Sequence, residues 1–301
     1  MFEGLSVAMV TPFRNGAVDR EATARLVDHM IEGGVQGLVV SGSTGEAATC
    51  TVEERRELWA FVRDRAKKRA WVVAGTGTNS TADSIALTRM AEELGLDGAM
   101  IVTPFYNKPT PKGQAAHFAA VAKSTKLPLI LYNVPGRTGT NTTPEVLAMV
   151  HDLPNVKAVK EASGNLDQMA QVKTRTKLTL LSGDDSLTLA CTAVGGEGIV
   201  SVVGQAAPKG MRPARAWSIS VRIGFGAAWP TTETMPSPPT AAHASVSESS
   251  PESSVSFVLV FTCAIWSRFP DASFTAFTFG RSCTMASTSG VVFVPVLPGT
   301  L

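Results

Sequence analysis

VKAVKEASGN, residues 156–165, predicts a short apolar strand, Val156–Glu161, that carries a lysine near its end, and the rest of the chain is organised around it. In an extended strand alternate side chains share a face, so Val156, Ala158 and Lys160 are predicted to point the same way. Lys160 then lies on an apolar face, where the strand runs into its loop. Burial lowers the pKa of an amine, and a neutral amine can attack a carbonyl to form a Schiff base. Alternatively, a lysine at a strand end extends its ammonium group into water.

Seven further apolar strands are predicted up to about residue 206. They are Leu5–Thr11, Gly37–Val40, Trp71–Gly75, Gly98–Val102, Leu127–Asn133, Leu178–Ser182 and Gly198–Val203. Eight such strands with helices between them indicate an α/β fold in which a parallel sheet is covered by helices. Eight units in about 200 residues favour a (β/α)8 TIM barrel. A doubly wound open sheet is the alternative, which is disfavoured because no GxGxxG or GxxxxGK[ST] loop follows the early strands.

Amphipathic helices are predicted between the strands. They are Arg20–Gly33, Val52–Lys68, Thr81–Leu94, Gly113–Ser124, Pro144–Asp152, Leu166–Lys173 and Ser186–Val194. Thr51 and Glu54 form the pattern of a capping box at the start of the second helix. The densest basic run, within residues 63–69, falls at the end of the same helix, where cations complement the helix dipole. We therefore assign no binding partner to this run.

Composition excludes several classes of protein. The chain has 301 residues and a net charge of +2, which is too small to indicate nucleic-acid binding. The four cysteines show no CxxC spacing and the four histidines form no ligand pair with them, so no structural metal is expected. The N-terminus has no basic residue before its first apolar run, unlike a secretory signal. The longest apolar run of the tail is shorter than the roughly 20 residues that span a bilayer. A cytoplasmic protein is expected.

In a TIM barrel the chemistry takes place where the strands run into the following loops. Polar segments are concentrated there, and they are SGSTGE (41–46), TPFYNKP (103–109), YNVPGRTG (132–139) and SGDDS (182–186). The glycines of SGSTGE allow a tight turn that can present the Ser43 and Thr44 hydroxyls, with backbone N–H groups, to an anion. Such a sequence is more often only a turn, so this signal is weak by itself.

Both tyrosines of the chain, Tyr106 and Tyr132, lie in these segments, together with Arg137. Taken singly, a buried tyrosine usually caps a core, and an arginine in a loop is usually solvated. Their coincidence with Lys160 at one rim is more informative. It predicts a reactive site in which the two phenols converge on the amine.

The chain resembles a known enzyme family along these motifs. The segments that carry the resemblance are GSTGE (42–46), AGTGTNST (74–81), TPFYNKP (103–109), YNVPGRTGTNT (132–142), VKAVKEASGN (156–165), LSGDDSLTL (181–189) and GGEGIVSV (195–202). They resemble the 4-hydroxy-tetrahydrodipicolinate synthase (dihydrodipicolinate synthase) family of the class I pyruvate-dependent aldolases, continuously from about residue 2 to residue 210. The resemblance implies a TIM-barrel lyase of diaminopimelate and lysine biosynthesis.

The resemblance also implies a mechanism. Lys160 would form a Schiff base with pyruvate, whose enamine adds to L-aspartate 4-semialdehyde to give 4-hydroxy-tetrahydrodipicolinate. Tyr132 would move protons beside the imine. Thr44 and Tyr106 would complete a hydroxyl relay, with Tyr106 supplied by the neighbouring subunit of a homo-oligomer, either a dimer or a tetramer. No metal or redox cofactor is implied, since imine chemistry needs neither.

Further positions would bind the substrates. The resemblance implies that the Ser43 and Thr44 hydroxyls hold the carboxylate of pyruvate, and that Gly183 and the carbonyl of Val200 line the same pocket. Arg137 would take the carboxylate of the second substrate, for which a forked guanidinium is well shaped. The partners expected are these two small molecules, with neither nucleic acid nor a membrane.

Two alternatives remain open within this resemblance. Another pyruvate or 2-keto-acid aldolase, similar to the sialate lyases, would share GSTGE and the lysine, but the arginine of VPGRTG is absent from the lyase pattern. Ser43 departs from the GTTGE that is common in the synthases, although it keeps a hydroxyl. The other alternative is a catalytically inactive product, because the C-terminal part of the chain does not fit the family.

The tail from residue 211 to residue 301 differs in character from the rest of the chain. No lysine follows Lys209, and serine, threonine and proline become dense, as in TETMPSPPTAAHASVSESSPESS. The family would have the eighth barrel helix and a small helical domain here, but the prolines would break such helices. We therefore expect two parts: a barrel over residues 1–210, incomplete at its last helix, and an out-of-frame, largely disordered tail. A genuine linker followed by a β-rich segment is the competing interpretation.

Overall fold

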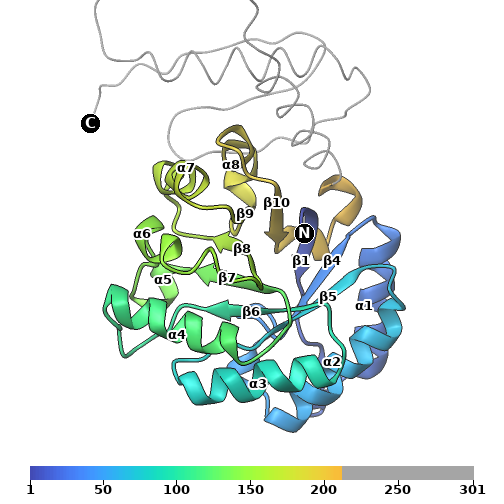
Figure 1. Cartoon of the computed structure of the whole chain (residues 1–301). Helices are drawn as coiled ribbons and strands as arrows, with labels where there is room; N and C mark the ends of the chain where they lie inside the picture. The colour runs from blue at the N-terminus through green and yellow to red at the C-terminus, as the bar shows by residue number, and fades with distance from the viewer. Residues whose placement is uncertain (212–301) are drawn as a thin grey trace, which may run out of the picture. The chain divides into compact units, whose positions relative to one another are not determined.

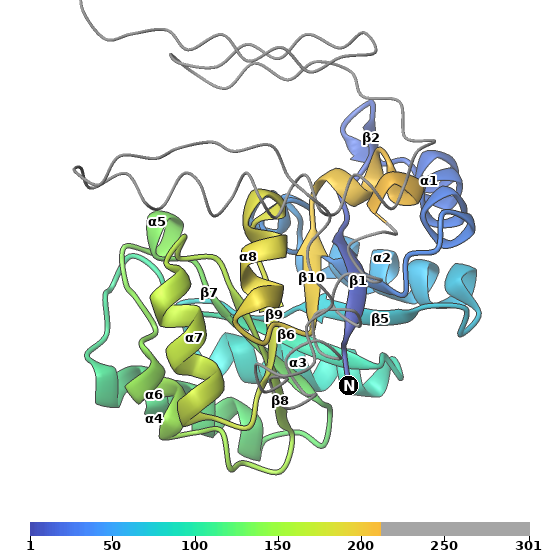
Figure 2. The same cartoon turned by 90° about the horizontal axis from the view of Figure 1, so that it is seen from above.

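A computed structural model describes residues 1–211, so the predictions for the tail lie outside the described residues, apart from its first position. Within them, eight parallel strands close into a barrel in the order β1-β10-β9-β8-β7-β6-β5-β4. The longer helices lie outside the ring of strands (Figure 1). β1 (Gly4–Ala8) and β10 (Gly198–Ser201) lie side by side and close the barrel (Figure 2). The predicted TIM barrel is confirmed, and the open sheet is excluded.

The remaining strands of the barrel also lie where they were predicted. They are β4 (Gly37–Val40), β5 (Trp71–Gly75), β6 (Gly98–Val102), β7 (Leu129–Asn133), β8 (Val156–Glu161) and β9 (Thr179–Ser182). A short hairpin, β2 (Phe13–Arg14) with β3 (Ala17–Val18), was not predicted. Its turn is Asn15-Gly16, and both residues have positive φ, which is typical of a two-residue hairpin turn.

Among residues 1–211, seven helices follow the strands as predicted, with shifted ends, and a further short helix, α5 (Pro135–Thr138), was not predicted. The longer ones are α1 (Arg20–Glu32), α2 (Val52–Ala66), α3 (Thr81–Glu93), α4 (Pro111–Lys123) and α7 (Leu166–Arg175), and the shorter ones are α5 (Pro135–Thr138), α6 (Pro144–Ala148) and α8 (Thr188–Ala193). Three single-turn 3-10 helices are η1 (Ala47–Thr49), η2 (Asp185–Leu187) and η3 (Val203–Gln205). The capping box of Thr51 and Glu54 is confirmed at the start of α2. Among the described residues, none of these helices is long and apolar enough to cross a membrane.

Apolar side chains of the strands divide into two clusters. One cluster packs against the helices, and the other, which includes Ile130, Tyr132 and Ala158, fills the inside of the barrel. Val156 was predicted to share the face of Ala158 and Lys160, and this is wrong: Val156 belongs to the outer cluster. The cause is a register irregularity at the start of the β7–β8 pairing, which moves Val156 off the alternation.

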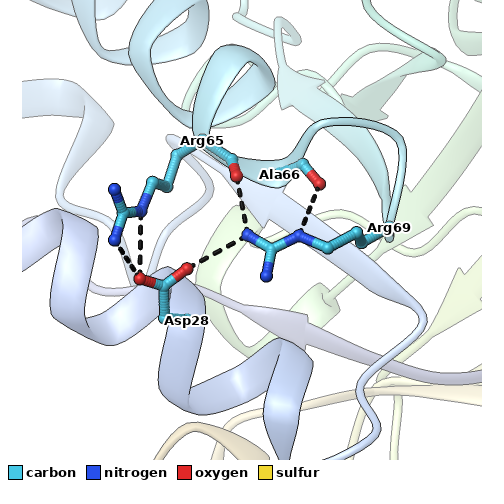
Figure 3. Close-up of polar contacts among 4 residues, drawn as sticks. All are labelled: Asp28, Arg65, Ala66 and Arg69. Atoms are coloured by element: carbon cyan, nitrogen blue, oxygen red, sulfur yellow. Dashed lines mark hydrogen bonds and ion pairs between the residues drawn. The ribbon is translucent and has the colours of Figure 1, made fainter.

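The basic run at the end of α2 stabilises the packing of helices. Asp28 of α1 accepts hydrogen bonds from Arg65 and Arg69, and Arg69 also donates to the carbonyl of Ala66 (Figure 3). The hydrogen bond from Arg65 holds the pKa of Asp28 below its usual value, although partial burial opposes this shift. These two arginines therefore have an intramolecular partner in Asp28.

Asp28→Asn should lower the midpoint of thermal unfolding by about 2 °C, because it removes the charge that both arginines share. Since the folded-state pKa of Asp28 is lowered, its contribution is present above the unfolded-state pKa and is lost as the pH falls through the folded-state value. The deficit of the variant should therefore shrink in acid and at high salt. Glu21→Gln is the matched control, since it breaks an exposed pair with Arg25 on the same helix. An equal shift in both variants would contradict a special role for Asp28.

Candidate active site

Lys160 lies at the end of β8 with only 4% of its surface exposed. It is paired in register with Tyr132 of β7, and its Nζ lies 4.1 Å from the centroid of the Tyr132 ring. Burial lowers the pKa of Lys160 from 10.5 to about 8, because the ammonium loses its water. Asp184 opposes this shift, and Arg137 adds to it. The prediction that Lys160 is buried is therefore confirmed. Because its pKa is about 8, a substantial fraction of the amine is neutral near pH 8.

Tyr132 is the second buried polar group of the site, with 6% of its surface exposed. Burial raises the pKa of its phenol, Asp184 raises it as well, and Arg137 lowers it together with a hydrogen bond to the side chain of Ser43. The phenol is thus protonated at neutral pH. Ser43 and Lys160 both lie close to Tyr132, the first through a side-chain hydrogen bond and the second with its Nζ over the ring.

The turn that carries Ser43 and Thr44 is held rigidly by its backbone. Gly45 is required there, because a Cβ at this position would lie 2.9 Å from the carbonyl oxygen of Met9. The residue before the turn, Ser41, is in the left-handed region with φ of 54°, and its hydroxyl accepts a hydrogen bond from Trp59 of α2 at 2.9 Å. The turn therefore has a fixed position at the mouth of the barrel, with Ser43 exposed and Thr44 half-buried.

Gly183 and Val200 close the same region from the neighbouring strands. The N–H of Gly183 donates to the carbonyl of Glu161 at 2.8 Å, and a Cβ on Gly183 would lie 2.5 Å from the Cβ of Ala162. Val200 is fully buried in the interior cluster that also contains Tyr132. Gly183 is thereby hydrogen-bonded to the end of β8, and Val200 lies in the cluster that contains Tyr132.

Arg137 and Tyr106 occupy exposed loops. Arg137 belongs to α5 and is exposed, yet it is near enough to shift the pKa values of both Lys160 and Tyr132. Tyr106 has 88% of its surface exposed and φ of 72°, and no hydrogen bond among residues 1–211 joins its phenol to Lys160. The predicted convergence of both phenols on the amine is therefore found for Tyr132 and is not found for Tyr106 within one chain.

Asp184 is a charged group near the amine that was not among the predicted site residues. It acts electrostatically on both Lys160 and Tyr132. The signal for it was present, since SGDDS places two acidic residues directly after β9. The second of them, Asp185, also raises the pKa of Lys160, and its carboxylate accepts hydrogen bonds from the N–H groups of Val202 at 2.9 Å and Val203 at 3.1 Å.

Metal binding has no evident place in the described part of the chain. In residues 1–211 no group of three His, Cys, Asp or Glu side chains is arranged to hold a metal ion. Cys50 and Cys191 are buried free thiols there, and burial raises the pKa of both; for Cys191 the value is about 12. Neither is therefore a reactive thiolate at neutral pH.

Comparison with known proteins identifies the family of this barrel. The profile of the dihydrodipicolinate synthetase family matches residues 1–215. The chain belongs to the dihydrodipicolinate synthetase family. A 4-hydroxy-tetrahydrodipicolinate synthase of Persephonella marina is 45% identical over 212 residues, which cover 69% of this chain and 72% of that protein. The family resemblance seen in the motifs is thereby confirmed.

Solved structures of the dihydrodipicolinate synthetase family have the same fold. The chloride-inhibited dihydrodipicolinate synthase of Acinetobacter baumannii, complexed with pyruvate, is 38% identical with a TM-score of 0.72, covering 75% of this chain and 78% of that one. A structure described as the first monomeric dihydrodipicolinate synthase variant is 40% identical with a TM-score of 0.72, covering 75% and 77%. The family therefore includes a monomer, so membership in it does not by itself fix an oligomeric state.

Proposed function

We propose that the chain is a Schiff-base lyase that condenses pyruvate with L-aspartate 4-semialdehyde to 4-hydroxy-tetrahydrodipicolinate. The observation that carries the proposal is the amine of Lys160, buried against the ring of Tyr132 with a pKa of about 8, in a member of the dihydrodipicolinate synthetase family. Two relatives with that activity in their names, from Persephonella marina and Citrifermentans bemidjiense, support it at 45% and 47% identity.

The chemistry can be followed from the lysine. The neutral amine of Lys160 attacks the ketone carbon of pyruvate, and water leaves to give an imine. Loss of a methyl proton yields the enamine, whose carbon adds to the aldehyde of the second substrate. The amino group of that substrate then attacks the imine carbon and displaces Lys160, which closes the ring. One water is released overall, and no electrons are exchanged with a cofactor.

The other site residues would serve this sequence. Tyr132, protonated and next to the amine, would give and take the protons of imine formation. Ser43 and Thr44 would hold the carboxylate of pyruvate at the fixed turn, with Gly183 and Val200 lining the pocket. Arg137, exposed at the mouth, would bind the carboxylate of the semialdehyde.

Tyr106 enters the proposal through a second subunit. Its phenol is exposed in the single chain. The family resemblance implies that this tyrosine reaches the active site of a neighbouring subunit. A homo-oligomer, dimer or tetramer, would therefore complete the relay of Tyr132, Thr44 and Tyr106. We also propose a cytoplasmic location, since the named relatives are biosynthetic enzymes.

We also propose that residues 211–301 are translated out of frame. The support for this is the change of composition after Lys209 and the end of the family match at residue 215. Resequencing the gene tests this: the alternative frame should encode charged amphipathic helices after codon 210. An alternative frame that encodes no such helices would contradict this proposal and favour a genuine linker. A catalytically inactive product is the alternative, and an assay of condensation with the full chain distinguishes the two.

A sialate lyase-like aldolase is the alternative within enzymes. Arg137 disfavours it, because a sugar-acid lyase has no need of a guanidinium at this position of VPGRTG. The experiment that decides is incubation of the full chain with pyruvate and borohydride, followed by peptide mass mapping and by assay with each aldehyde. An adduct on Lys160 with turnover of aspartate semialdehyde supports the proposal. An adduct with cleavage of a sugar acid supports the alternative, and no adduct rejects both.

The reactivity of Lys160 should depend on pH in a specific way. Because burial lowers its pKa to about 8, its rate of acylation by a small anhydride should rise with pH and level off above about 8. Asp184→Asn removes a charge that raises this pKa, so the profile should move to lower pH. Lys157 is the internal reference, since it is exposed on the same strand and appears in the same mass map. Identical profiles for the two lysines would contradict the lowered pKa.

A further inference from the structure

Glu161 is a fully buried carboxylate directly after the reactive lysine, on the opposite face of β8. Burying a carboxylate is costly unless hydrogen bonds satisfy its oxygens. Its partners are all neutral N–H donors: the amide of Asn133 at 3.0 Å from both oxygens, the backbone of Ser163 at 2.7 Å and the amide of Gln168 at 2.9 Å. One carboxylate thus ties together the ends of β7 and β8 and the first turn of α7.

Asn141 extends this arrangement into the loop after β7. Its Oδ1 accepts hydrogen bonds from Asn133 at 2.7 Å and from Gln168 at 3.2 Å, while its Nδ2 donates to Gln168 Oε1 at 2.8 Å. Asn133 Oδ1 in turn accepts from the N–H of Thr142 at 2.8 Å. These contacts use both amide protons of Asn133 and of Gln168. The pattern is consistent only if Glu161 acts as an acceptor with both of its oxygens.

The segment fixed in this way is the loop of residues 134–142. Asn133, the residue before the loop, is held by Glu161, and Thr142 at its other end shares hydrogen bonds with Thr103 at 2.7 Å and with Gln114 at 2.9 Å. The loop carries Arg137 on its exposed turn, α5. The position of the guanidinium at the mouth of the barrel therefore depends on how firmly the base of the loop is held.

We propose that Glu161 is a positioning residue, which holds the loop of residues 134–142 so that Arg137 meets the carboxylate of the second substrate. The inference rests on the proposed function for the identity of that substrate. Glu161 lies on the face of β8 away from the reacting amine, so it touches no substrate itself. It acts on the second half of the reaction, after Lys160 has formed its imine.

Two variants separate this role from simple loss of structure. Glu161→Gln keeps the shape but replaces one acceptor oxygen by an NH2 group that faces N–H donors. Asn141→Ala cuts the loop from the network and leaves β8 and its carboxylate intact, so it serves if the first variant does not fold. Glu92→Gln is the matched control: Glu92 accepts from Thr125 at 2.8 Å and from the N–H of Lys126 at 2.9 Å, at the end of α3.

In both test variants, amide hydrogen exchange in residues 134–142 should be faster than in wild type, and in Glu92→Gln it should be unchanged. The KM for aspartate semialdehyde should rise about tenfold, while the rate of borohydride-trapped pyruvate adduct on Lys160 should stay within about threefold. In an Arg137→Ala background, Glu161→Gln should raise the KM little further, because the contact it positions is already gone.

Unchanged exchange in the loop would overturn the proposal, and so would an equal loss of adduct formation and condensation in Glu161→Gln and Asn141→Ala. Additive effects of Glu161→Gln and Arg137→Ala on the KM would also overturn it. Failure of the proposed function looks different: the wild-type chain would then form no pyruvate adduct, or would form one without turning over aspartate semialdehyde. Amide hydrogen exchange in residues 134–142 would still decide whether Glu161 holds the segment that carries Arg137.

Discussion

Lys160→Met should abolish the pyruvate adduct and lower the rate of condensation by at least about a thousandfold, since no other group takes over a covalent nucleophile. Methionine has a similar length and no charge, so it suits a site where only 4% of the lysine is exposed. The barrel should therefore remain folded. The measurement is peptide mass mapping after incubation with pyruvate and borohydride, combined with a rate assay on the same sample.

Lys157→Met is the matched control for this experiment, because Lys157 lies three residues earlier in β8 and is exposed. It should leave both the adduct and the rate unchanged. An adduct that persists in Lys160→Met at another lysine would contradict the assignment of the nucleophile. Condensation without any adduct would contradict the Schiff-base route itself.

The position of Lys160 in the barrel follows from the alternation of side chains along the strand. The same alternation fails at the start of β8. Ala158 and Lys160 point into the barrel as predicted, because they lie beyond the register irregularity. Val156 does not, since a shift in pairing leaves no trace in a pattern of apolar residues. The eight strands were recognisable because parallel strands buried on both faces are continuously apolar.

Features built from few residues escaped prediction. The hairpin of β2 and β3 has strands of two residues each, too short to show a period, although its Asn15-Gly16 turn was a usable signal. Similarly, α5 is one turn inside the polar segment YNVPGRTG. These elements shape the mouth of the barrel, where loop geometry rather than periodicity decides the structure.

The burial of Glu161 shows that the environment of a charged residue is hard to predict from sequence. A glutamate that alternates with apolar residues on a strand is normally interpreted as solvent-exposed, and nothing local indicates otherwise. It is fully buried because Asn133 and Gln168, 28 residues before it and 7 after it, supply donors from other elements. Such a network can be inferred only after β7, β8 and α7 have been placed next to one another.

Tyr132→Phe should slow both adduct formation and condensation by about a hundredfold, the usual size for loss of a positioned acid or base. The variant keeps the ring that lies 4.1 Å from Lys160 and removes only the hydroxyl, so packing and stability should change little. Because burial raises the pKa of this phenol, it enters the reaction protonated and can donate when water leaves the forming imine. The measurement is the rate of borohydride trapping on Lys160 at saturating pyruvate.

Tyr106→Phe is the matched comparison for Tyr132→Phe. The same hydroxyl is removed there from a side chain that is 88% exposed in the single chain. If a neighbouring subunit supplies Tyr106, its loss should slow the reaction only in the oligomeric fraction separated by size, whereas the loss of Tyr132 should act in every fraction. Equal losses of rate in both variants of a monomer would show that Tyr106 reaches the amine of its own chain. An unchanged rate in Tyr132→Phe would show that this phenol takes no part in the mechanism.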